Sequence, residues 1–407
     1  MKQQLSKVRQ PQKFDFILTI ILVLIFISSI IAIYAAFPLV PAYVPTGGFN
    51  GILGKQIQFY IIGIIVIAII MYLGNDNLNT FARIGYFIFL ALLIYLFLDL
   101  HIFQRFLGMT LPFAKTVNGA TAWLEFPFIG TIQPSEFMKV ILIIISAYTI
   151  VDHNEDKRED SFESDIQLFL KLGKWLLPPL ALILLQPDTG IFLIIILTIL
   201  LMVICSGIRR EWIIIGTILV VVALVTFFYL FYFNQTLFTK IFGSSYKVKR
   251  IYGWLYPEQY STSAGLQLYS SILSLGSSGL TGHGFQADVI SIPEAHTDFI
   301  FAAIGMNFGF LGCIFIVGLC VALDLRLFLI ASRSKNNIEK LMIIGFLGML
   351  IIQQLENIGM VIGLFPITGI TLPLISSGGS SLLSYMLAFG IVMNASLKAK
   401  KLSDYVY

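Results

Sequence analysis

Positively charged side chains in two predicted outer segments could hold an anion. Lys247, Lys249 and Arg250 fall within four residues and lie among tyrosine and tryptophan side chains. Arg105 and Lys115 belong to a segment that we predict, from the arrangement described below, at the same end of the molecule. Because ammonium and guanidinium groups form strong hydrogen bonds with phosphate oxygens, a phosphate-bearing ligand is one interpretation. Ordinary contact with lipid phosphates is the other.

Acidic residues stand at the start of two apolar runs on that same side. Asp298 follows the sequence PEAHT directly, and Asp188 lies in the turn QPDTG. An aspartate in either place could cap a helix or belong to a binding or catalytic site. His296, two residues before Asp298, is either a catalytic group or an ordinary hydrogen-bonded loop histidine. The types and spacing of these residues leave the alternatives open.

Some charged residues lie inside apolar runs, where ionisable groups are costly and often functional. Glu136 and Lys139 are three residues apart, so they share a helix face and could form a structural ion pair or contact a ligand. Glu356 stands beside Gln353 and Asn357, and this polar cluster must face the interior of a helix bundle. The cluster could join helices or touch a ligand.

The composition excludes most classes of protein. Of 407 residues, 57% are hydrophobic and only 12% are charged, and the mean hydropathy is +0.89. A soluble domain carries about 25% charged residues, so this chain is a membrane protein that crosses the bilayer several times. The net charge of +4 gives no reason to expect nucleic acid. Cys205, Cys313 and Cys320 lie in apolar runs and predict neither disulfides nor a metal site. We expect no cleavable signal peptide.

The apolar runs predict an all-α bundle of about ten membrane-spanning helices, since each span needs about 20 apolar residues. The runs are continuous rather than alternating, which favours helices over a barrel. The fifth is short and contains two prolines. We predict spans at 15–36, 56–73, 81–100, 135–151, 175–187, 189–207, 211–233, 298–322, 341–363 and 379–397.

Most of the 26 lysines and arginines lie in segments that this arrangement places on the same side of the membrane as the N-terminus. Because cytoplasmic segments are enriched in these residues, both termini are predicted to be cytoplasmic. A mixed-charge cytoplasmic loop is expected at 152–174. A large extracytoplasmic loop is expected at 234–297, between the seventh and eighth helices, with short helices packed on the bundle.

Four stretches, in the same order, resemble the SEDS family of cell shape, elongation, division and sporulation proteins, which includes RodA and FtsW. Two of them are Asn118–Lys139, which contains QPSEFMK, and the turn Gln186–Gly190. The third combines GLTGHG (Gly279–Gly284) with IPEAHTDFIFAAIG (Ile292–Gly305). The fourth, Asn357–Ser381, is similar to the family's C-terminal signature almost throughout. The resemblance implies one SEDS transmembrane domain over 1–407, in a bacterial cytoplasmic membrane.

The resemblance also implies an activity. SEDS proteins are peptidoglycan glycosyltransferases that polymerise lipid II at the outer face of the membrane. They act with a class B penicillin-binding protein and with other elongation or division proteins. We expect an elongation role like that of RodA, because both predicted tails are short. The alternatives are a division role like that of FtsW, a lipid II flippase or transporter, and a non-catalytic scaffold.

The family's essential carboxylate corresponds to Asp298, which the resemblance implies as general base. The lysine and glutamate of the QPSEF element correspond to Lys139 and Glu136. No certain cofactor is implied, although a divalent cation, Mg²⁺ or Mn²⁺, could accompany the substrate pyrophosphate. Candidate substrate-binding residues are Lys139, Glu136, Lys247, Lys249, Arg250, Arg105, Lys115, His296 and Asp188.

The chain departs from the family pattern at two places. Thr121 and Ala122 stand where the family often has a basic pair. If that pair contacts phosphate, Lys115 or the Lys247–Arg250 cluster must replace it. Met306 and Asn307 stand where the family often has two glutamates. We therefore expect no acid–base role there.

Overall fold

The computed structural model describes residues 14–117, 120–126, 130–157, 161–242 and 246–403. For residues 117, 242, 246–247 and 398–403, only the backbone is described. Within these ranges, nine helices are long and apolar enough to cross a membrane. They are α1 (Phe16–Ala35), α2 (Ile52–Leu73), α3 (Leu78–Leu98) with its π-helical continuation η2 (Asp99–Leu107), α4 (Pro134–Asp156), α5 (Phe162–Leu185), α7 (Arg210–Phe233), α11 (Ile300–Arg333), α12 (Asn337–Val361) and α13 (Gly379–Ser403).

A shorter apolar helix, α6 (Thr189–Cys205), completes the set of spans that the sequence predicts. The predicted all-α polytopic fold is therefore confirmed. The predicted limits of the fifth span were wrong: α5 begins at Phe162 and contains both Pro178 and Pro179. The charged loop predicted at 152–174 is shorter than expected, because α4 continues to Asp156 and α5 begins six residues later.

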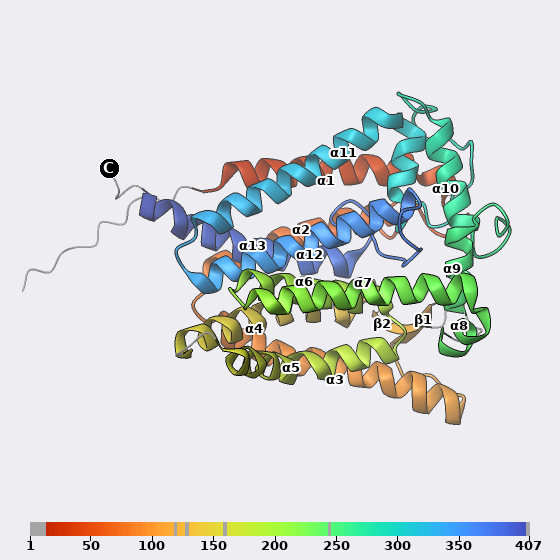
Figure 1. Cartoon of the computed structure of the whole chain (residues 1–407). Helices are drawn as coiled ribbons and strands as arrows, with labels where there is room; N and C mark the ends of the chain where they lie inside the picture. Colours follow the sequence, from red (N-terminus) through yellow and green to blue (C-terminus); the bar gives the residue numbers. More distant parts are fainter. Residues whose placement is uncertain (1–13, 118–119, 127–129, 158–160, 243–245, 404–407) are drawn as a thin grey trace, which may run out of the picture.

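The helices run side by side, and the shorter elements gather at one end of the bundle (Figure 1). The described part of the segment predicted as a large loop at 234–297 contains three helices, which Figure 1 shows across this end. A small antiparallel sheet in strand order β1-β2-β3 lies at the same end and was not expected. These elements are α8 (Gln235–Phe242), α9 (Tyr246–Leu255), α10 (Leu266–Ser277), β1 (Ala114–Val117), β2 (Ala120–Phe126) and β3 (Gly130–Ile132). A 3-10 turn, η1 (Phe37–Leu39), follows α1.

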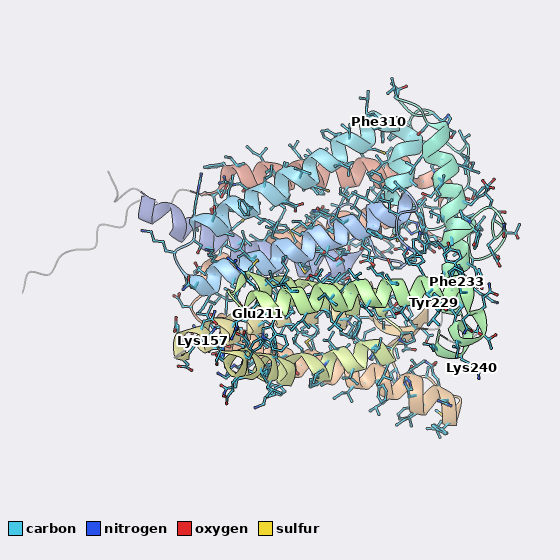
Figure 2. The ribbon with its side chains drawn as sticks, viewed as in Figure 1. Lys157, Glu211, Tyr229, Phe233, Lys240 and Phe310 are labelled. Atoms are coloured by element: carbon cyan, nitrogen blue, oxygen red, sulfur yellow. The ribbon has the colours of Figure 1, made fainter. Side chains whose placement is uncertain are left out.

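The helix α4 is the centre of the bundle. In its most apolar window 83% of the residues are buried, whereas in that of α7 none is. Figure 2 shows α7 along the near side of the bundle, with Glu211 at one end and Tyr229 and Phe233 at the other. The polar groups of α4 therefore need protein partners, while α7 presents apolar side chains as a lipid-facing helix does.

The start of α1 contacts α11 and α13 at the opposite end of the bundle. Asp15, at the start of α1, accepts hydrogen bonds from Arg326 of α11 at 2.6 and 2.8 Å and from Ser396 of α13 at 2.7 Å. Arg326 and Asp15 are both buried, so this ion pair fixes α1 against α11 and α13. The N-terminal and C-terminal helices consequently have these ends on one side of the bundle.

Candidate functional site

An irregular stretch of chain, the connecting segment 362–378, joins α12 to α13 and forms the base of the candidate site. Irregular backbone in a membrane protein needs internal hydrogen-bond partners, because lipid offers none. Here, polar side chains from surrounding helices donate to its carbonyl oxygens. The donor and acceptor pairs are Ser29–Ile375, Gln56–Ser376, Tyr60–Leu374, Arg250–Ile367, Trp254–Gly363, Gln353–Thr371 and Asn357–Ile370.

The connecting segment also holds the residues that precede α11. The hydroxyl of Ser376 donates to the Thr297 carbonyl at 2.6 Å, and the Ser377 amide donates to the His296 carbonyl at 2.9 Å. The side-chain amide of Asn357 donates to the Asp298 and Ile370 carbonyls, each at 2.7 Å. The backbone at Asp298 is thereby fixed against the connecting segment from two sides.

The carboxyl group of Asp298 is set in this fixed backbone. Asp298 is half-buried, and it does not cap α11, because the N-cap residue is Phe299. A Cβ atom placed on Gly369 would lie 3.4 Å from Asp298 Oδ2, so the carboxylate faces the connecting segment closely. Burial raises the pKa of the Asp298 carboxyl to about 7; the Glu294 carboxylate raises it as well, and Arg250 opposes the shift. A carboxylate with such a pKa is suited to accept a proton near neutral pH.

The predicted cation cluster lies partly at this site. The positive charge of Arg250, on α9, lowers the pKa of the Asp298 carboxyl. The Arg250 guanidinium donates to the Ile367 carbonyl at 3.0 Å. Trp254, one helical turn later, donates to the Gly363 carbonyl at 3.0 Å, so α9 is docked on the connecting segment. Lys249 is exposed beside Arg250. Lys247 belongs to α9, but its side chain lies outside the described part of the structure.

The other two predicted cations are placed differently. Lys115 on β1 forms an ion pair with Glu125 on β2, at 2.9 Å between Nζ and Oε1. Arg105 is exposed on η2. The structure gives no contact between either residue and Asp298 within the described ranges. The sequence placed all these cations in one group; among their described side chains, Arg250 is the one whose charge lowers the pKa of the Asp298 carboxyl.

Glu136 and Lys139 form the buried ion pair that was one of the two sequence-based interpretations. Their Oε2 and Nζ atoms are 2.7 Å apart, and the Lys139 side chain is 1% exposed. Lys139 also donates to Gln353 of α12 at 2.9 Å and to the Tyr385 hydroxyl of α13 at 3.3 Å. This arrangement supports a role in joining α4, α12 and α13, because the ammonium is enclosed by protein groups. The same Gln353 holds the connecting segment at Thr371.

Asp188 has the helix-capping role that the sequence left open. Its Oδ1 atom accepts from the Ile191 amide at 3.3 Å, at the start of α6. Its Oδ2 atom accepts from Gln133 at 2.8 Å and from Ser135 at 3.1 Å. Burial raises the pKa of the Asp188 carboxyl, despite these donors. Asp188 therefore joins the start of α6 to the start of α4.

His296 lies in the same element as Asp298 but is held differently. Its backbone carbonyl accepts from Ser377, while its Nδ1 atom is buried without a hydrogen-bond partner in the described structure. Burial lowers the pKa of the imidazole, so its neutral form is favoured. A buried polar atom without a partner is a place where a water molecule or a ligand can bind.

The glycine-rich GLTGHG stretch packs against α11 at the point where that helix is interrupted. At Gly309 the helix leaves helical geometry, with φ 63° and ψ −158°. Residues of the loop replace the lost helical bonds: the His283 amide donates to the Met306 carbonyl at 2.8 Å, and the Phe310 amide donates to the Gly279 carbonyl at 3.0 Å. The two backbones touch, since a Cβ atom on Gly309 would lie 2.4 Å from the Gly282 nitrogen.

Asn307 explains one departure from the family pattern. It is buried at this break, where its Nδ2 donates to the Ala303 carbonyl at 2.8 Å and its Oδ1 accepts from the Ala287 amide at 3.0 Å. A side chain at this position must donate and accept at the same time. Asparagine does both while neutral, so Asn307 serves to hold the loop, and the expectation that it takes no acid–base role is consistent with these bonds.

Sequence reasoning missed two residues. Glu294 lies beside Asp298 and adopts a positive φ of 56°, and only its short sequence separation from Asp298 could have pointed to it. Lys55, at the start of α2, lines a cavity that also contains Glu125 and Phe126. No sequence signal places these residues around one cavity, because the sheet that carries Glu125 and Phe126 was not predicted.

Comparisons with known proteins agree with this architecture. The family model described as cell cycle protein (FtsW/RodA/SpoVE) matches residues 15–401. A probable peptidoglycan glycosyltransferase FtsW of Lactococcus lactis is 32% identical over 359 residues, which cover 85% of this chain and 84% of that protein. The peptidoglycan glycosyltransferase MrdB of Escherichia coli is 32% identical over 302 residues, covering 72% of this chain and 75% of MrdB.

Solved structures share the fold. A chain from a peptidoglycan synthase complex that coordinates polymerization and crosslinking superposes with a TM-score of 0.72 at 24% identity, covering 95% of this chain and 98% of that one. The rod shape determining protein RodA of Thermus thermophilus superposes with a TM-score of 0.63 at 25% identity, covering 94% and 96%. With a family model that spans nearly the whole sequence, these findings show that the chain belongs to the FtsW/RodA/SpoVE family, the SEDS proteins.

Proposed function

We propose that this membrane protein is a peptidoglycan glycosyltransferase that polymerises lipid II into glycan strands at the outer face of the cytoplasmic membrane. Relatives from L. lactis and E. coli that bear the name peptidoglycan glycosyltransferase support the activity. The observation that carries the proposal for the site is Asp298, a half-buried carboxylate beside Arg250 on a backbone fixed by Asn357.

In the proposed reaction, the Asp298 carboxylate takes the proton from the 4-hydroxyl of an acceptor GlcNAc. The hydroxyl oxygen forms a bond to C1 of a donor MurNAc, and the bond from C1 to the polyprenyl pyrophosphate breaks. An α-phosphate becomes a β-linkage, so a single inverting displacement is sufficient. The base must approach within about 2.6–3.2 Å of the hydroxyl oxygen. Its pKa of about 7 gives a substantial ionised fraction near neutral pH.

The departing pyrophosphate needs positive charge nearby. Arg250 and the exposed Lys249 are the described cations of α9, which is docked on the connecting segment beside Asp298. Among the described residues, no three His, Cys, Asp or Glu side chains form a group that could hold a metal ion. A divalent cation would therefore be held mainly by the phosphate oxygens of the substrate.

The bundle gives the reaction a consistent orientation in the membrane. Asp15 and Ser396 contact each other at one end, whereas α8, α9, α10 and the sheet lie at the other (Figure 1). With cytoplasmic termini, as the distribution of lysine and arginine predicts, Asp298 faces the outer side. The sugars then stay at the outer surface, and the polyprenyl chain lies in lipid between helices.

We propose a class B penicillin-binding protein as the partner that cross-links the peptides. The similarity to a chain from a peptidoglycan synthase complex supports this pairing. Within the family, we propose an elongation role, which the fold shared with RodA of T. thermophilus supports. A division role is the second candidate, favoured by relatives named FtsW. A fluorescent fusion separates the two, because enrichment at the septum alone contradicts elongation.

The test of the activity uses the purified full chain in detergent or vesicles, with lipid II and a class B partner. The wild type is expected to produce a ladder of glycan strands, and Asp298→Asn to lose about a hundredfold or more of the rate. Circular dichroism and partner binding serve as controls for folding. Wild-type polymerisation by Asp298→Asn contradicts the role of the base. Absence of any ladder from the wild type, together with movement of lipid II between leaflets, contradicts the polymerase and favours a flippase.

A further inference from the structure

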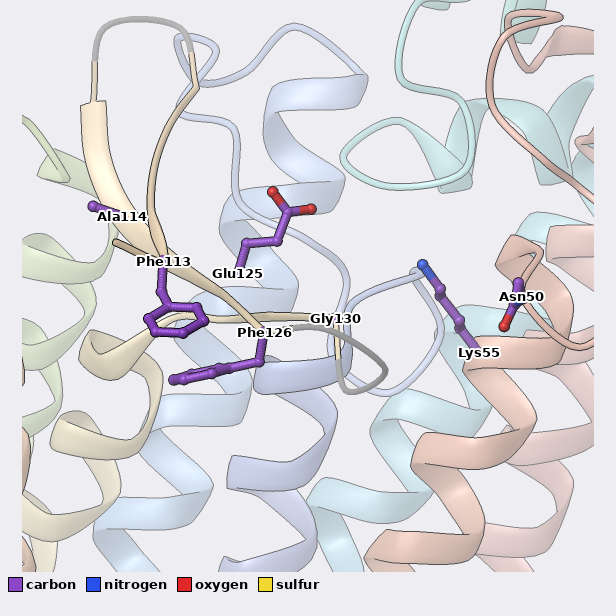
Figure 3. Close-up of a pocket in the computed structure, with 7 residues that line it drawn as sticks. All are labelled: Asn50, Lys55, Phe113, Ala114, Glu125, Phe126 and Gly130. Carbon is purple, nitrogen blue, oxygen red and sulfur yellow. The ribbon is translucent and has the colours of Figure 1, made fainter. Parts of the chain in front are cut away.

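A cavity of about 640 Å³ lies between the start of α2 and the small sheet (Figure 3). We propose that it binds the aminosugar–peptide part of lipid II or of the growing strand, rather than the pyrophosphate. This inference rests on the proposed function and adds a second binding region to it. The cavity is within the size range of ligand sites. Its lining residues are Asn50, Lys55, Phe113, Ala114, Glu125, Phe126 and Gly130.

Two aromatic rings form an apolar face of the cavity. Phe113 and Phe126 stack with ring centroids 5.3 Å apart and an angle of 26° between their planes. Both lie on the sheet side of the cavity, opposite Lys55 and Asn50 (Figure 3). The flat C–H face of a pyranose ring can pack on such a surface. The polar groups at the opposite wall can bond the hydroxyl and acetamido groups that the same sugar carries.

The charges of the cavity do not suit a pyrophosphate. Lys55 is exposed, and its ammonium takes part in no ion pair or hydrogen bond within the described part of the chain. Glu125 brings a carboxylate to the same cavity and is bonded to Lys115 at 2.9 Å. A ligand with several negative charges would be repelled by Glu125. A peptide attached to an aminosugar carries its carboxylates apart from one another beside neutral sugar groups, so one of them can contact the Lys55 ammonium while the others stay away from Glu125.

The cavity is joined to the Asp298 site through the backbone. Thr131 of β3 pairs with Glu125 across the sheet, and its carbonyl accepts from the Ser380 hydroxyl at 3.1 Å. The same hydroxyl accepts from the Gln133 amide at 2.9 Å. Ser380 follows the connecting segment that holds Asp298 by two residues. One continuous stretch of chain therefore fixes both the cavity wall and the proposed base.

The test measures binding and catalysis separately. Calorimetry on the purified full chain uses a lipid-free GlcNAc–MurNAc-pentapeptide as the probe, with the disaccharide without peptide for comparison. Lys55→Gln is expected to weaken binding of the peptide-bearing probe at least fivefold and to leave the bare disaccharide unchanged. In polymerisation, the same variant should raise KM for lipid II with little change in kcat, as loss of uniform binding does. Lys55→Arg should preserve binding.

The controls keep this proposal distinct from the proposed function. Lys240→Gln removes an exposed cation of α8 at the same end of the molecule (Figure 2); Lys240 is not among the residues that line the cavity, and the change should affect neither quantity. Asp298→Asn should bind the probe like the wild type while losing polymerisation. Equal affinity of Lys55→Gln and wild type for the peptide-bearing probe, or no binding by the wild type, overturns the cavity proposal and leaves the activity untouched. Binding by a wild type that makes no polymer overturns the activity and leaves the cavity proposal standing.

Discussion

The side-chain amide of Asn357 donates to the backbone carbonyls of Asp298 and Ile370, each at 2.7 Å. One residue of α12 thus joins the proposed base to the connecting segment. Asn357 is fully buried, so its side chain holds these two carbonyls away from bulk water on its own side of the bonds. The position of the base consequently depends on a residue that has no acid–base chemistry of its own.

Replacing Asn357 with alanine is expected to lower kcat/KM by about ten- to a hundredfold, because a shift of about 1 Å in a reacting group can cost this much. Each carbonyl left unpaired also destabilises the protein by about 1–3 kcal/mol. Polymerisation kinetics and thermal unfolding in detergent measure the two effects. Asn394→Ala is the matched control, since Asn394 is a buried donor to the Ile70 carbonyl at 2.8 Å. Equal losses of activity in both variants would show that the effect is only one of stability.

The rate of polymerisation is expected to rise with pH through about 7 and to level off about one unit higher. The Asp298 carboxyl, whose pKa is raised to about 7, must lose its proton before it can act as base. Glu294→Gln removes a negative charge that raises this pKa, so the rising limb should move to lower pH. The measurement is kcat/KM against pH for both proteins. A profile that stays flat between about pH 6 and 8 in the wild type would contradict the assignment of the base.

Lys139→Met is expected to destabilise the protein by about 3–5 kcal/mol, because it leaves the Glu136 carboxylate buried without its partner. The double variant Lys139→Met, Glu136→Gln removes both charges and should recover most of that loss. Thermal unfolding of the wild type, the two single variants and the double variant measures the coupling. Recovery of stability together with polymerisation supports a structural ion pair. Recovery of stability without polymerisation would instead indicate that Lys139 serves the substrate.

Gly309→Ala is expected to prevent stable folding or to lower the unfolding temperature sharply. The residue has a positive φ of 63°, and an added Cβ would lie 2.4 Å from the Gly282 nitrogen and 2.5 Å from the Leu280 carbonyl carbon. Gly318→Ala in the same helix is the control, since no neighbouring atom lies within 4 Å of its added Cβ. Expression yield and thermal unfolding distinguish the two. Similar stability of both variants would show that the loop can withdraw from α11 without cost.

The bundle could be predicted from the sequence because a membrane span is a local property. Continuous apolar runs indicated every span, including α6, although it is only 17 residues long. The limits of α5 were harder to predict, because the helix extends beyond its apolar part through the charged residues between Phe162 and Lys174. The sheet was missed because its strands are short and lie in a segment with no strong alternation.

The site was only partly predictable. The family resemblance identified Asp298, and the sequence marked Gln353 and Asn357 as polar residues that must face the interior. What the sequence could not give is the partner of each group. Tyr60, for example, donates to the carbonyl of Leu374, which is 314 residues away. Such bonds end on backbone atoms, which every residue carries, so residue types do not reveal them.

The hydrogen bonds that hold the connecting segment have a consequence for mutation. Along this segment the acceptors are main-chain carbonyls, whereas the donors are side chains of α1, α2, α9 and α12. Exchanging a residue of the segment leaves its carbonyl, and so the bond, in place. Exchanging Ser29 or Tyr60 removes a bond outright. For these bonds, a change of residue in the segment should therefore cost less than a change at a polar donor deep among the apolar helices, such as Ser29 or Tyr60.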